Sequence, residues 1–479
     1  MLTAMPPPPA NHLNRDETPV RERGDACPGA LRLHTADDGA LARVRLPAGV
    51  LTARQAHSLA EAAERLGDGA LHLTSRGNLQ LRGLGAACGG PLAELLHGAG
   101  LLPAPRHERV RNIVASPFSG LDGRGTRDVQ PLARELDALL CASERAAALS
   151  GRFLFALDDG RGDMAGLGAD VTLRAAAVED AHPGAPADRE AAVVVAGGAA
   201  VRVPCADGPR TMLLAAEAFL DAAEASGTRA WRVAELPPGR GPSTSALLDR
   251  AAAAGIAAEA APVPRPGPAV PPPAPGHRPP SAGRAASGGA PPGAAYVLAP
   301  LGRLTAAQWR AAADLADRRG TGELRATPWR GLVLPGLPAR FLPALAEAGL
   351  VTDPASPWHG TGACIGRPGC AKALSDVRAD ATAAVSGTPG GGPPGDLPVY
   401  WSGCERRCGH PHGARIDVVA TGDGRYDLTV AGGTGPQPSP ADHPDPPAAA
   451  LPGLDPGRLA AALAAVRSAP AHHRPSTTK

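Results

Sequence analysis

The sequence has little net charge, no long apolar run and almost no lysine. Its 479 residues carry 48 basic and 46 acidic side chains, which gives a formal charge of +2. So nearly neutral a chain offers no broad cationic surface, and we expect neither a nucleic-acid nor a membrane partner. No stretch approaches the roughly 18 apolar residues of a membrane-spanning helix, and residues 1–24 lack the apolar centre of a secretory signal. A cytoplasmic protein is expected.

Lysine occurs only at Lys372 and Lys479, whereas alanine, glycine, proline and arginine are abundant. This pattern indicates compositional bias, so an arginine is not a functional signal unless its position adds to the argument. Eight cysteines occur in this long chain. Without an export signal, they are better explained as ligands or buried thiols than as disulfides.

An internal repeat organises the chain. Residues 51–84 align with residues 304–337 without a gap, at a constant offset of 253. Both copies open with Leu-Thr-x-x-Gln, in which Thr52 or Thr305 can cap a helix and the glutamine can return a bond to the cap. Each helix is expected to end at a glycine, Gly67 or Gly320.

Two strands are predicted after each helix. Leu71 and Leu73 alternate with polar residues, as a half-buried strand requires, and a second strand follows the turn Ser75-Arg76-Gly77. With a strand at residues 41–46, each repeat reads strand, helix, hairpin. Because such a unit leaves one sheet face uncovered, we expect the two copies to pack together, which makes an α+β protein with a doubled architecture.

Composition divides the chain into seven segments. Residues 262–294 are dominated by proline, glycine and alanine and are expected to form a solvated linker. The predicted segments are a disordered N-terminus at 1–26, a first repeat unit at 27–104, an α+β domain at 105–261, the linker at 262–294, a second repeat unit at 295–353, a second α+β domain at 354–432 that holds four cysteines, and a loose tail at 433–479.

The four cysteines of the last domain form two pairs. Cys364 and Cys370 have five residues between them, Cys404 and Cys408 have three, and 33 residues separate the pairs. A cubane iron-sulfur cluster needs four soft anionic ligands, and neighbouring glycines such as Gly366 and Gly403 let the backbone pass close to it. This set predicts a [4Fe-4S] cluster, with the four cysteines as both cofactor-binding and metal-ligating residues.

Zinc ligation, disulfide bonding and inert burial are the alternative roles for these cysteines. Structural zinc favours two to four residues between paired ligands, so the five-residue gap disfavours zinc. Disulfides are disfavoured by a reducing compartment, and inert buried thiols by the glycine-rich surroundings. Cys27, Cys88, Cys141 and Cys205 have no mutual ligand spacing and are interpreted as inert thiols.

The cysteine pattern behind a duplicated strand-helix-hairpin unit resembles the sirohaem and [4Fe-4S] sulfite and nitrite reductases, over about residues 27–432. The resemblance implies two ferredoxin-like halves paired about a pseudo-twofold axis, plus two α+β domains that enclose the metal centre. It also implies that Cys408 touches the haem iron where haem is present.

Further motifs narrow the resemblance to the precorrin-3B synthase family within that superfamily. They are Cys27-Pro28-Gly29, Thr74-Ser75-Arg76-Gly77, Val110-Arg111-Asn112-Ile113, Thr327-Pro328-Trp329-Arg330 and the segment 363–370. This resemblance implies cobalamin (vitamin B12) biosynthesis: an oxygen-dependent hydroxylation and lactone formation that convert precorrin-3A to precorrin-3B. The implied substrates are a tetrapyrrole and dioxygen, and the implied cofactors are the cluster with sirohaem or a mononuclear non-haem iron.

Three residues are the candidate catalytic arginines: Arg76, Arg111 and Arg152. Arg76 and Arg111 match anion-binding arginines of the reductases, and Arg152-Phe153-Leu154 stands where those enzymes carry Lys-x-Lys. Leu154 removes a positive charge and a proton donor, so the site suits a bulky, partly apolar substrate better than a small anion. Arg76 and Arg111 would hold its carboxylate arms; the alternative role for each is a solvated turn residue or a structural ion pair.

Two sets of residues near these motifs are ambiguous. Trp329 and Arg330 could line the site or only anchor a turn. His359, His410 and His412 could bind a mononuclear iron, but solvated loop histidines are the simpler account.

The sequence has no dinucleotide-binding fingerprint. A separate reductase or ferredoxin is therefore expected to deliver electrons derived from NAD(P)H. The alternative functions are a sirohaem-dependent assimilatory sulfite or nitrite reductase, and a cluster-bearing electron carrier or sensor.

Overall fold

The structure is a computed structural model. It describes residues 25, 27–176, 191–264, 270–280, 293–386, 397–411, 413–431, 450–455, 457–459 and 461–463. The expected disorder of the first two dozen residues falls almost wholly outside this range. No helix in the described part of the chain is long and apolar enough to cross a bilayer.

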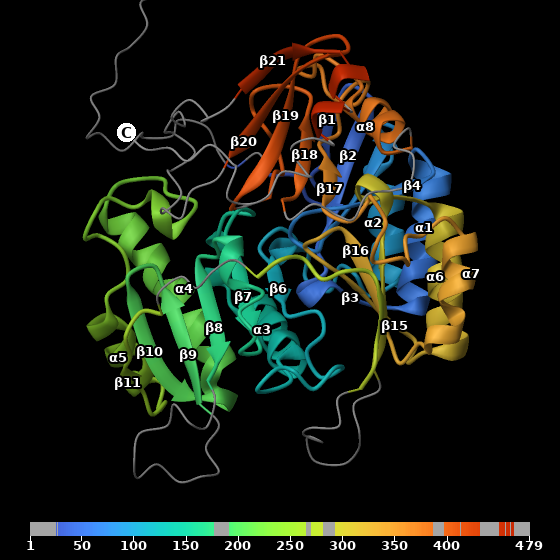
Figure 1. Ribbon diagram of the computed structural model, residues 1–479. Helices are drawn as coiled ribbons and strands as arrows, with labels where there is room; N and C mark the ends of the chain where they lie inside the picture. Colours follow the sequence, from blue (N-terminus) through green and yellow to red (C-terminus); the bar gives the residue numbers. More distant parts are fainter. Residues whose placement is uncertain are drawn as a thin grey trace, which may run out of the picture.

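Four sheets and a layer of helices build the molecule (Figure 1). Two five-stranded antiparallel sheets come from the repeats, and two mixed sheets come from the larger domains. The first repeat sheet has the order β1 (His34–Ala36), β2 (Gly39–Val44), β5 (Leu79–Leu84), β4 (Ala70–Leu73) and β14 (Arg303–Thr305). The second has the order β12 (Gly276–Arg278), β13 (Ala294–Leu298), β16 (Gly331–Pro335), β15 (Glu323–Ala326) and β3 (Val50–Thr52).

The two repeats exchange an edge strand. β3 belongs to the first repeat but pairs with β15, with Leu51 opposite Leu324. β14 belongs to the second repeat but pairs with β4, with Leu304 opposite Leu71. Since each sheet is completed by the other repeat, the halves form one unit. The α+β class and the paired halves predicted from the sequence are confirmed.

Helices of the two repeats pack against each other beside these sheets: α1 (Ala53–Leu66) and α2 (Gly89–Gly98) from the first, α6 (Ala306–Arg319) and α7 (Leu342–Glu347) from the second (Figure 1). Thr52 and Thr305 form the predicted capping boxes with Gln55 and Gln308. Both helices end at the predicted glycines, where a Cβ would lie 2.7 Å from the Arg82 carbonyl at Gly67 and 2.8 Å from the Pro335 carbonyl at Gly320.

Trp309 marks the pseudo-twofold axis. Its side chain is fully buried, and its Nε1 donates to the Ala56 carbonyl at 2.8 Å. Ala56 and Trp309 are 253 residues apart, so the bond joins positions that the repeat alignment equates. One continuous core extends across both halves at this point.

Strands β4 and β16 are buried along their whole length, and β15 is buried except at Glu323, which corrects the half-buried prediction for these strands. All four residues of β4 are buried, including His72. In β15, Arg325 is only 6% exposed and donates to the carbonyls of Pro117 and Ser119 in the first large domain. The alternating polar residues therefore contact the large domains.

Each large domain contains three parallel strands followed by antiparallel ones. In the first, the order is β11 (Glu259–Ala260), β10 (Ala199–Pro204), β9 (Ala191–Ala196), β8 (Val171–Ala175), β7 (Phe155–Asp158) and β6 (Ile113–Ala115). In the second it is β17 (Thr361–Ala363), β18 (Val399–Ser402), β19 (Arg415–Gly422), β20 (Arg425–Ala431) and β21 (Ala450–Leu454). Strands β6, β7 and β8 correspond to β17, β18 and β19.

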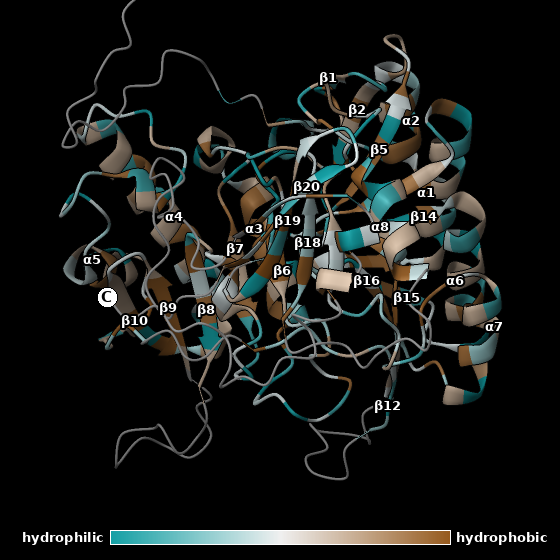
Figure 2. Ribbon diagram, turned by 45° about the horizontal axis from the view of Figure 1, so that its top comes forward, coloured by the Kyte–Doolittle hydropathy of each residue, from teal (hydrophilic) through white to brown (hydrophobic). Residues whose placement is uncertain are grey.

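Helices α3 (Gln130–Ala142), α4 (Gly208–Ala225) and α5 (Thr244–Ala253) belong to the first large domain, and α8 (Val377–Ser386) to the second. Strands β9 and β10 are largely hydrophobic, whereas α1 and α6 mix hydrophobic and hydrophilic residues (Figure 2). This difference follows from burial: β9 and β10 contribute to the apolar core of their domain, and the two helices expose one side.

Two segments expected to be loose contribute strands. Within the predicted linker, Gly276–Arg278 forms β12, and His277 pairs with Ala295 of β13. Within the predicted tail, Ala450–Leu454 forms β21 against β20. Composition did not show either strand, because an edge strand depends on backbone hydrogen bonds to a neighbour more than on its own side chains.

Replacing Trp309 by alanine should lower the free energy of unfolding by about 3–5 kcal/mol, because a large buried side chain and its hydrogen bond are lost where the halves meet. Urea unfolding followed by circular dichroism measures the change. Arg65→Ala, on the exposed side of α1, is the control and should leave the midpoint within error. An equal shift in both variants would contradict the role given to Trp309.

Candidate functional site

The four cysteines of the motif lie on the loops that follow β17 and β18. Cys364 comes directly after β17, and Cys404 follows β18 by two residues. Because β17 and β18 are adjacent and parallel, their carboxyl ends lie together. The Cys364 amide donates to the Trp401 carbonyl at 2.9 Å, and the Gly403 amide donates to Cys364 Sγ at 3.1 Å. Two segments far apart in sequence thus present their thiols at one place.

The thiols affect one another electrostatically. Burial raises the pKa of Cys364, and the neighbouring Cys404 and Cys370 raise it further. Burial also raises the pKa of Cys408, as do the other three cysteines. All four are free thiols. Among the described residues, no three of these sulfur atoms lie within 4.8 Å of one another, whereas four thiolates around one zinc ion at about 2.3 Å would lie closer together.

The first repeat holds the loop between Cys364 and Cys370. Arg82 forms a bidentate ion pair with Asp38, both bonds at 2.8 Å, and also donates to the Gly369 carbonyl at 2.8 Å. Asp37 accepts the Ala371 amide. A Cβ on Gly369 would lie 2.8 Å from the Asp38 carboxylate. The turn between β1 and β2 therefore fixes the cysteine loop from the other half of the molecule.

Two arginines and a tyrosine hold the cysteine loops from the second half. Arg330 has a left-handed backbone, φ 60°, and its Nη2 donates to the Gly409 carbonyl at 2.8 Å. The Tyr400 hydroxyl donates to the Cys408 carbonyl at 2.7 Å. Arg378 Nε donates to the Cys364 carbonyl at 3.2 Å, and burial lowers its pKa to about 10.

This arrangement fits a [4Fe-4S] cluster. Four thiols converge on loops tied to both halves, and glycines permit close backbone approach. The positive charges of Arg330 and Arg378 would offset the negative charge of thiolate ligands.

The histidines near the cysteines do not form a metal site with one another in the described structure. His359 is partly buried, with Nδ1 lacking a hydrogen-bond partner. His410 Nδ1 is 2.9 Å from the Pro411 carbonyl. His412 lies outside the described residues.

Arg76 and Arg152 lie together, within a group of arginines that the sequence did not reveal. Arg76 Nη1 donates to the Arg152 carbonyl at 3.1 Å. Burial lowers the pKa of Arg76 to about 9, and the positive charges of Arg232, Arg45 and Arg43 contribute to this shift. Arg43 and Arg45 follow the pattern of an ordinary strand, which is why sequence reasoning missed them.

These guanidinium groups lack carboxylate partners. Among the described residues, no ion pair involves Arg43, Arg45 or Arg76, while Arg232 pairs with Asp170 at 2.5 Å. Arg45 is 3% exposed, and its Nη1 is buried without a hydrogen-bond partner. Burying a charge without a counterion is costly, so the group is suited to an anionic ligand.

Arg111 is occupied elsewhere. Its Nε and Nη2 form a bidentate ion pair with Asp137 at 2.7 and 2.6 Å, and Nη1 donates to the Leu101 carbonyl at 3.3 Å. The side chain is buried, and the hydrogen bonds to Asp137 raise its pKa against the opposing effect of burial. In this structure Arg111 holds two segments of the protein together and contacts none of the arginine group.

Leu154 lies inside a small apolar cluster and not on an open surface. It is 1% exposed and packs with Val114, Ala156 and Met164, and Trp329 lies partly buried against the same cluster. Trp329 therefore joins the hairpin turn of the second repeat to the first large domain.

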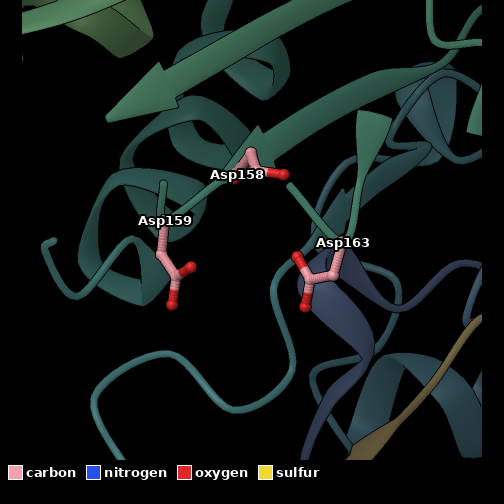
Figure 3. A group of neighbouring side chains, drawn as sticks. All are labelled: Asp158, Asp159 and Asp163. Atoms are coloured by element: carbon pink, nitrogen blue, oxygen red, sulfur yellow. The ribbon is translucent and has the colours of Figure 1, made fainter. Parts of the chain in front are cut away.

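Three aspartates gather at the equivalent loop of the first large domain (Figure 3). Asp158 ends β7, and the next residue, Asp159, donates its amide to Ser116 Oγ at 3.1 Å. Ser116 directly follows β6, and its own amide donates to the Leu157 carbonyl at 3.0 Å. The same two bonds connect Cys364 with Gly403 and Trp401, so Ser116 stands where the second domain has Cys364.

The carboxylates of this loop are satisfied within the protein. Asp158 accepts the amides of Gly160, Gly162 and Met164 at 2.9–3.0 Å. Asp159 forms a bidentate pair with Arg161. Their oxygen atoms lie within 4.8 Å of those of Asp163, but Arg161 already supplies the positive charge. The acidic loop is therefore a structural counterpart of the cysteine loop.

Comparison with known proteins agrees with this doubled architecture. The nitrite/sulfite reductase ferredoxin-like half domain matches the chain twice, at residues 34–97 and 293–349. The chain therefore contains two copies of the ferredoxin-like half domain of nitrite and sulfite reductases. The two matched segments contain the repeats that exchange edge strands. The cysteine loops lie outside both segments.

The matched relatives have two different activities. Ferredoxin–nitrite reductase of Synechococcus elongatus is 28% identical over 407 residues, which cover 79% of this chain and 76% of that protein. Precorrin-3B synthase of a Sinorhizobium species is 35% identical over 154 residues, about a third of each protein. The NirA structure of Mycobacterium tuberculosis aligns with a TM-score of 0.65 and 17% identity, over 92% of this chain and 82% of that one, and shows the fold.

Replacing Cys364 or Cys408 by serine should abolish the cluster, because a hydroxyl is a poor substitute for a thiolate ligand. Iron and acid-labile sulfide per chain measure this loss after anaerobic purification. Cys205→Ser, a buried thiol outside the motif, should retain the wild-type content. A full cluster in either motif variant would contradict the ligand set.

Asp163 should make stability depend on pH. Burial raises its pKa to about 7, and Asp158 and Asp159 contribute. Because the folded protein binds this proton more tightly than the unfolded chain, the contribution to stability is complete below the ordinary pKa and is lost as pH rises through about 7. Asp163→Asn should therefore gain stability relative to wild type on going from pH 5 to pH 8.

Urea midpoints at the two pH values measure the gain. Asp423→Asn is the control, since the Asp423 side chain is 84% exposed and its replacement should not change the pH dependence. If the urea midpoints of wild type and Asp163→Asn differ by the same amount at pH 5 and at pH 8, the raised pKa of Asp163 is contradicted.

Proposed function

We propose that this protein acts in cobalamin biosynthesis and converts precorrin-3A to precorrin-3B by oxygen-dependent hydroxylation and lactone formation. The observation that carries the proposal is the group of arginines without carboxylate partners, Arg43, Arg45 and Arg76, next to the apolar cluster that contains Leu154 and Trp329. The precorrin-3B synthase relative supports the same reaction. A tetrapyrrole with several carboxylate arms and an apolar ring system matches both features.

The chain's own residues would bind and orient this substrate. The guanidinium groups of Arg76, Arg43 and Arg45 would donate hydrogen bonds to carboxylate arms of the substrate, since guanidinium binds carboxylate through paired hydrogen bonds. Trp329, which is partly exposed at the edge of the Leu154 cluster, would contact the ring and keep water away from it. Cys364, Cys370, Cys404 and Cys408 would hold the [4Fe-4S] cluster, which supplies single electrons when bound.

The electrons would come from a separate protein, a ferredoxin or an NAD(P)H-dependent reductase. Two matched relatives are named as ferredoxin-dependent nitrite reductases, from Synechococcus elongatus and Haloferax mediterranei, the latter 32% identical over 186 residues. A second centre would be sirohaem or a mononuclear iron.

The second candidate function is a sirohaem-dependent nitrite or sulfite reductase. Its support is the long match to the Synechococcus elongatus enzyme, which spans 76% of that protein. The apolar Leu154 weakens it, because a small anion needs a positive charge and a proton donor at that position.

One experiment separates the two functions. Anaerobically purified protein is analysed for metals and visible absorption, then incubated with precorrin-3A, oxygen and a reductant, and the products are analysed by mass spectrometry. We expect the hydroxylated lactone and no turnover of nitrite or sulfite. A strong haem band together with nitrite or sulfite turnover driven by reduced methyl viologen would replace the proposal by the reductase function.

Arg76 and Arg111 should differ when each is replaced by alanine. Loss of Arg76 removes charge-assisted bonds to the substrate and should raise KM by about 10-fold or more, with little change in stability. Loss of Arg111 leaves the partly buried Asp137 carboxylate and the Leu101 carbonyl without their donor and should lower the free energy of unfolding by about 1–3 kcal/mol. Steady-state kinetics and urea unfolding of both variants test the contrast, and the reverse pattern would place Arg111 in the site.

A further inference from the structure

Cys27 lies beside Arg43 and Arg45, and hydrogen bonds to Asp25 attach its backbone to the loop at Ser150 and Gly151. The Asp25 carboxylate accepts the amides of Cys27 at 2.9 Å and Gly151 at 2.8 Å, and the Ser150 hydroxyl at 3.0 Å. These bonds fix where the thiol points.

The thiol points at two guanidinium groups. Arg43 Nη1 and Arg45 Nη2 donate to Cys27 Sγ at 3.5 and 3.4 Å, and Sγ is 3.5 Å from the Gly151 carbonyl. Cys27 is 9% exposed. Most of the surroundings of the thiol are therefore protein, and only a small part of the residue faces solvent.

No carboxylate in the described chain forms an ion pair with these two arginines, although the Gln80 side-chain oxygen accepts from Arg43 Nη2 at 2.6 Å. Arg45 donates otherwise only to the carbonyls of Arg109 and Gly151, and its buried Nη1 has no partner. Asp25 acts electrostatically on Arg43, and Glu108 on Arg45. However, Asp25 pairs with Arg109, and Glu108 accepts the backbone amides of Ala30 and Leu31. An anion attached to the sulfur would supply the missing acceptor.

The other inert-looking thiols have different surroundings. Burial and the nearby Asp137 raise the pKa of Cys141, although Arg111 partly opposes them. Burial raises the pKa of Cys205. Cysteines that react with oxidants sit in electropositive surroundings, and of these three only Cys27 contacts two guanidinium groups that have no ion pair in the described structure.

We propose that Cys27 is an oxidation site whose oxidised sulfur is held as an anion by Arg43 and Arg45. The oxidant is a hydroperoxide, in the simplest case hydrogen peroxide. One peroxide converts the thiol to sulfenic acid: an S–O bond forms, the O–O bond breaks, the sulfur loses two electrons, and the other oxygen leaves as water. A second peroxide forms the sulfinic acid in the same way, and its proton goes to solvent.

The added oxygen atoms extend from Sγ toward the guanidinium groups, where the unpartnered Arg45 Nη1 can donate to them. The product occupies the same arginines that would bind carboxylate arms. On the function proposed above, oxidation of Cys27 would therefore weaken binding of the substrate and slow an oxygen-consuming enzyme when peroxide accumulates.

The rate of thiol loss at each cysteine tests the proposal. Cluster-loaded protein without substrate is exposed to dilute hydrogen peroxide, quenched at intervals in denaturant with N-ethylmaleimide, and digested, so that each unoxidised thiol is counted by mass spectrometry on its own peptide. We expect Cys27 to be lost about tenfold faster than Cys141 and Cys205, with masses corresponding to added oxygen. Exposure alone predicts a different order, because Cys141 is more exposed than Cys27.

Variants identify the arginines as the cause. Arg45→Met, which keeps the length of the side chain without its charge, should slow the loss of Cys27 to the rate of Cys141. The control is Arg65→Met, which alters an arginine whose side chain is 63% exposed. It should leave the rate of thiol loss at Cys27 unchanged.

If Cys27 in the wild type reacts no faster than Cys141 and Cys205, the oxidation site is refuted without any variant. If Arg45→Met reacts like wild type, the guanidinium groups are not responsible and the proposal fails. Because no substrate is present, failure of the cobalamin assignment leaves these rates unchanged, so the two proposals are tested separately.

Discussion

The exchange of edge strands between the two repeats is the constraint on which the rest of the molecule depends. β3 completes the sheet of the second repeat and β14 completes the sheet of the first, so neither sheet is whole without the other. The hydrogen bond from Trp309 to Ala56 then locks the helices together at equivalent positions. With the repeats fixed about one axis, the two large domains must face each other across the same axis.

That symmetry gives a pair of equivalent loops, and they have diverged. After β17 and β18 the chain presents thiols; after β6 and β7 it presents Ser116 and the three aspartates. The backbone hydrogen bonds are the same in both places. What differs is the source of positive charge: Arg161 neutralises the aspartate loop from within, whereas thiolates need a metal. Duplication therefore supplied the scaffold twice, and side chains made only one copy suitable for a cluster.

The buried arginines fall into two groups, those with aspartate partners and those without. Arg82, Arg111 and Arg161 form bidentate pairs with aspartates and hold loops in place. Arg43, Arg45 and Arg76 have no such partners among the described residues, and burial lowers the pKa of each. Arginine is abundant in this chain, so its presence alone says little about function. An arginine that is paired with a carboxylate has a structural role, whereas one without such a partner is a candidate for binding an anionic ligand.

The sequence by itself determined the repeat, its capping boxes, the paired halves and the four-cysteine set, because these depend on local spacing and on identical patterns recurring along the chain. It could not distinguish Arg76 from Arg111, since the difference lies in Asp137, 26 residues away. Nor could it show the strand exchange, the strand β12 within a proline-rich segment, or Arg43 and Arg45 beside Cys27. Those features depend on which backbone edges and side chains meet after folding, and only the tertiary structure brings them into contact.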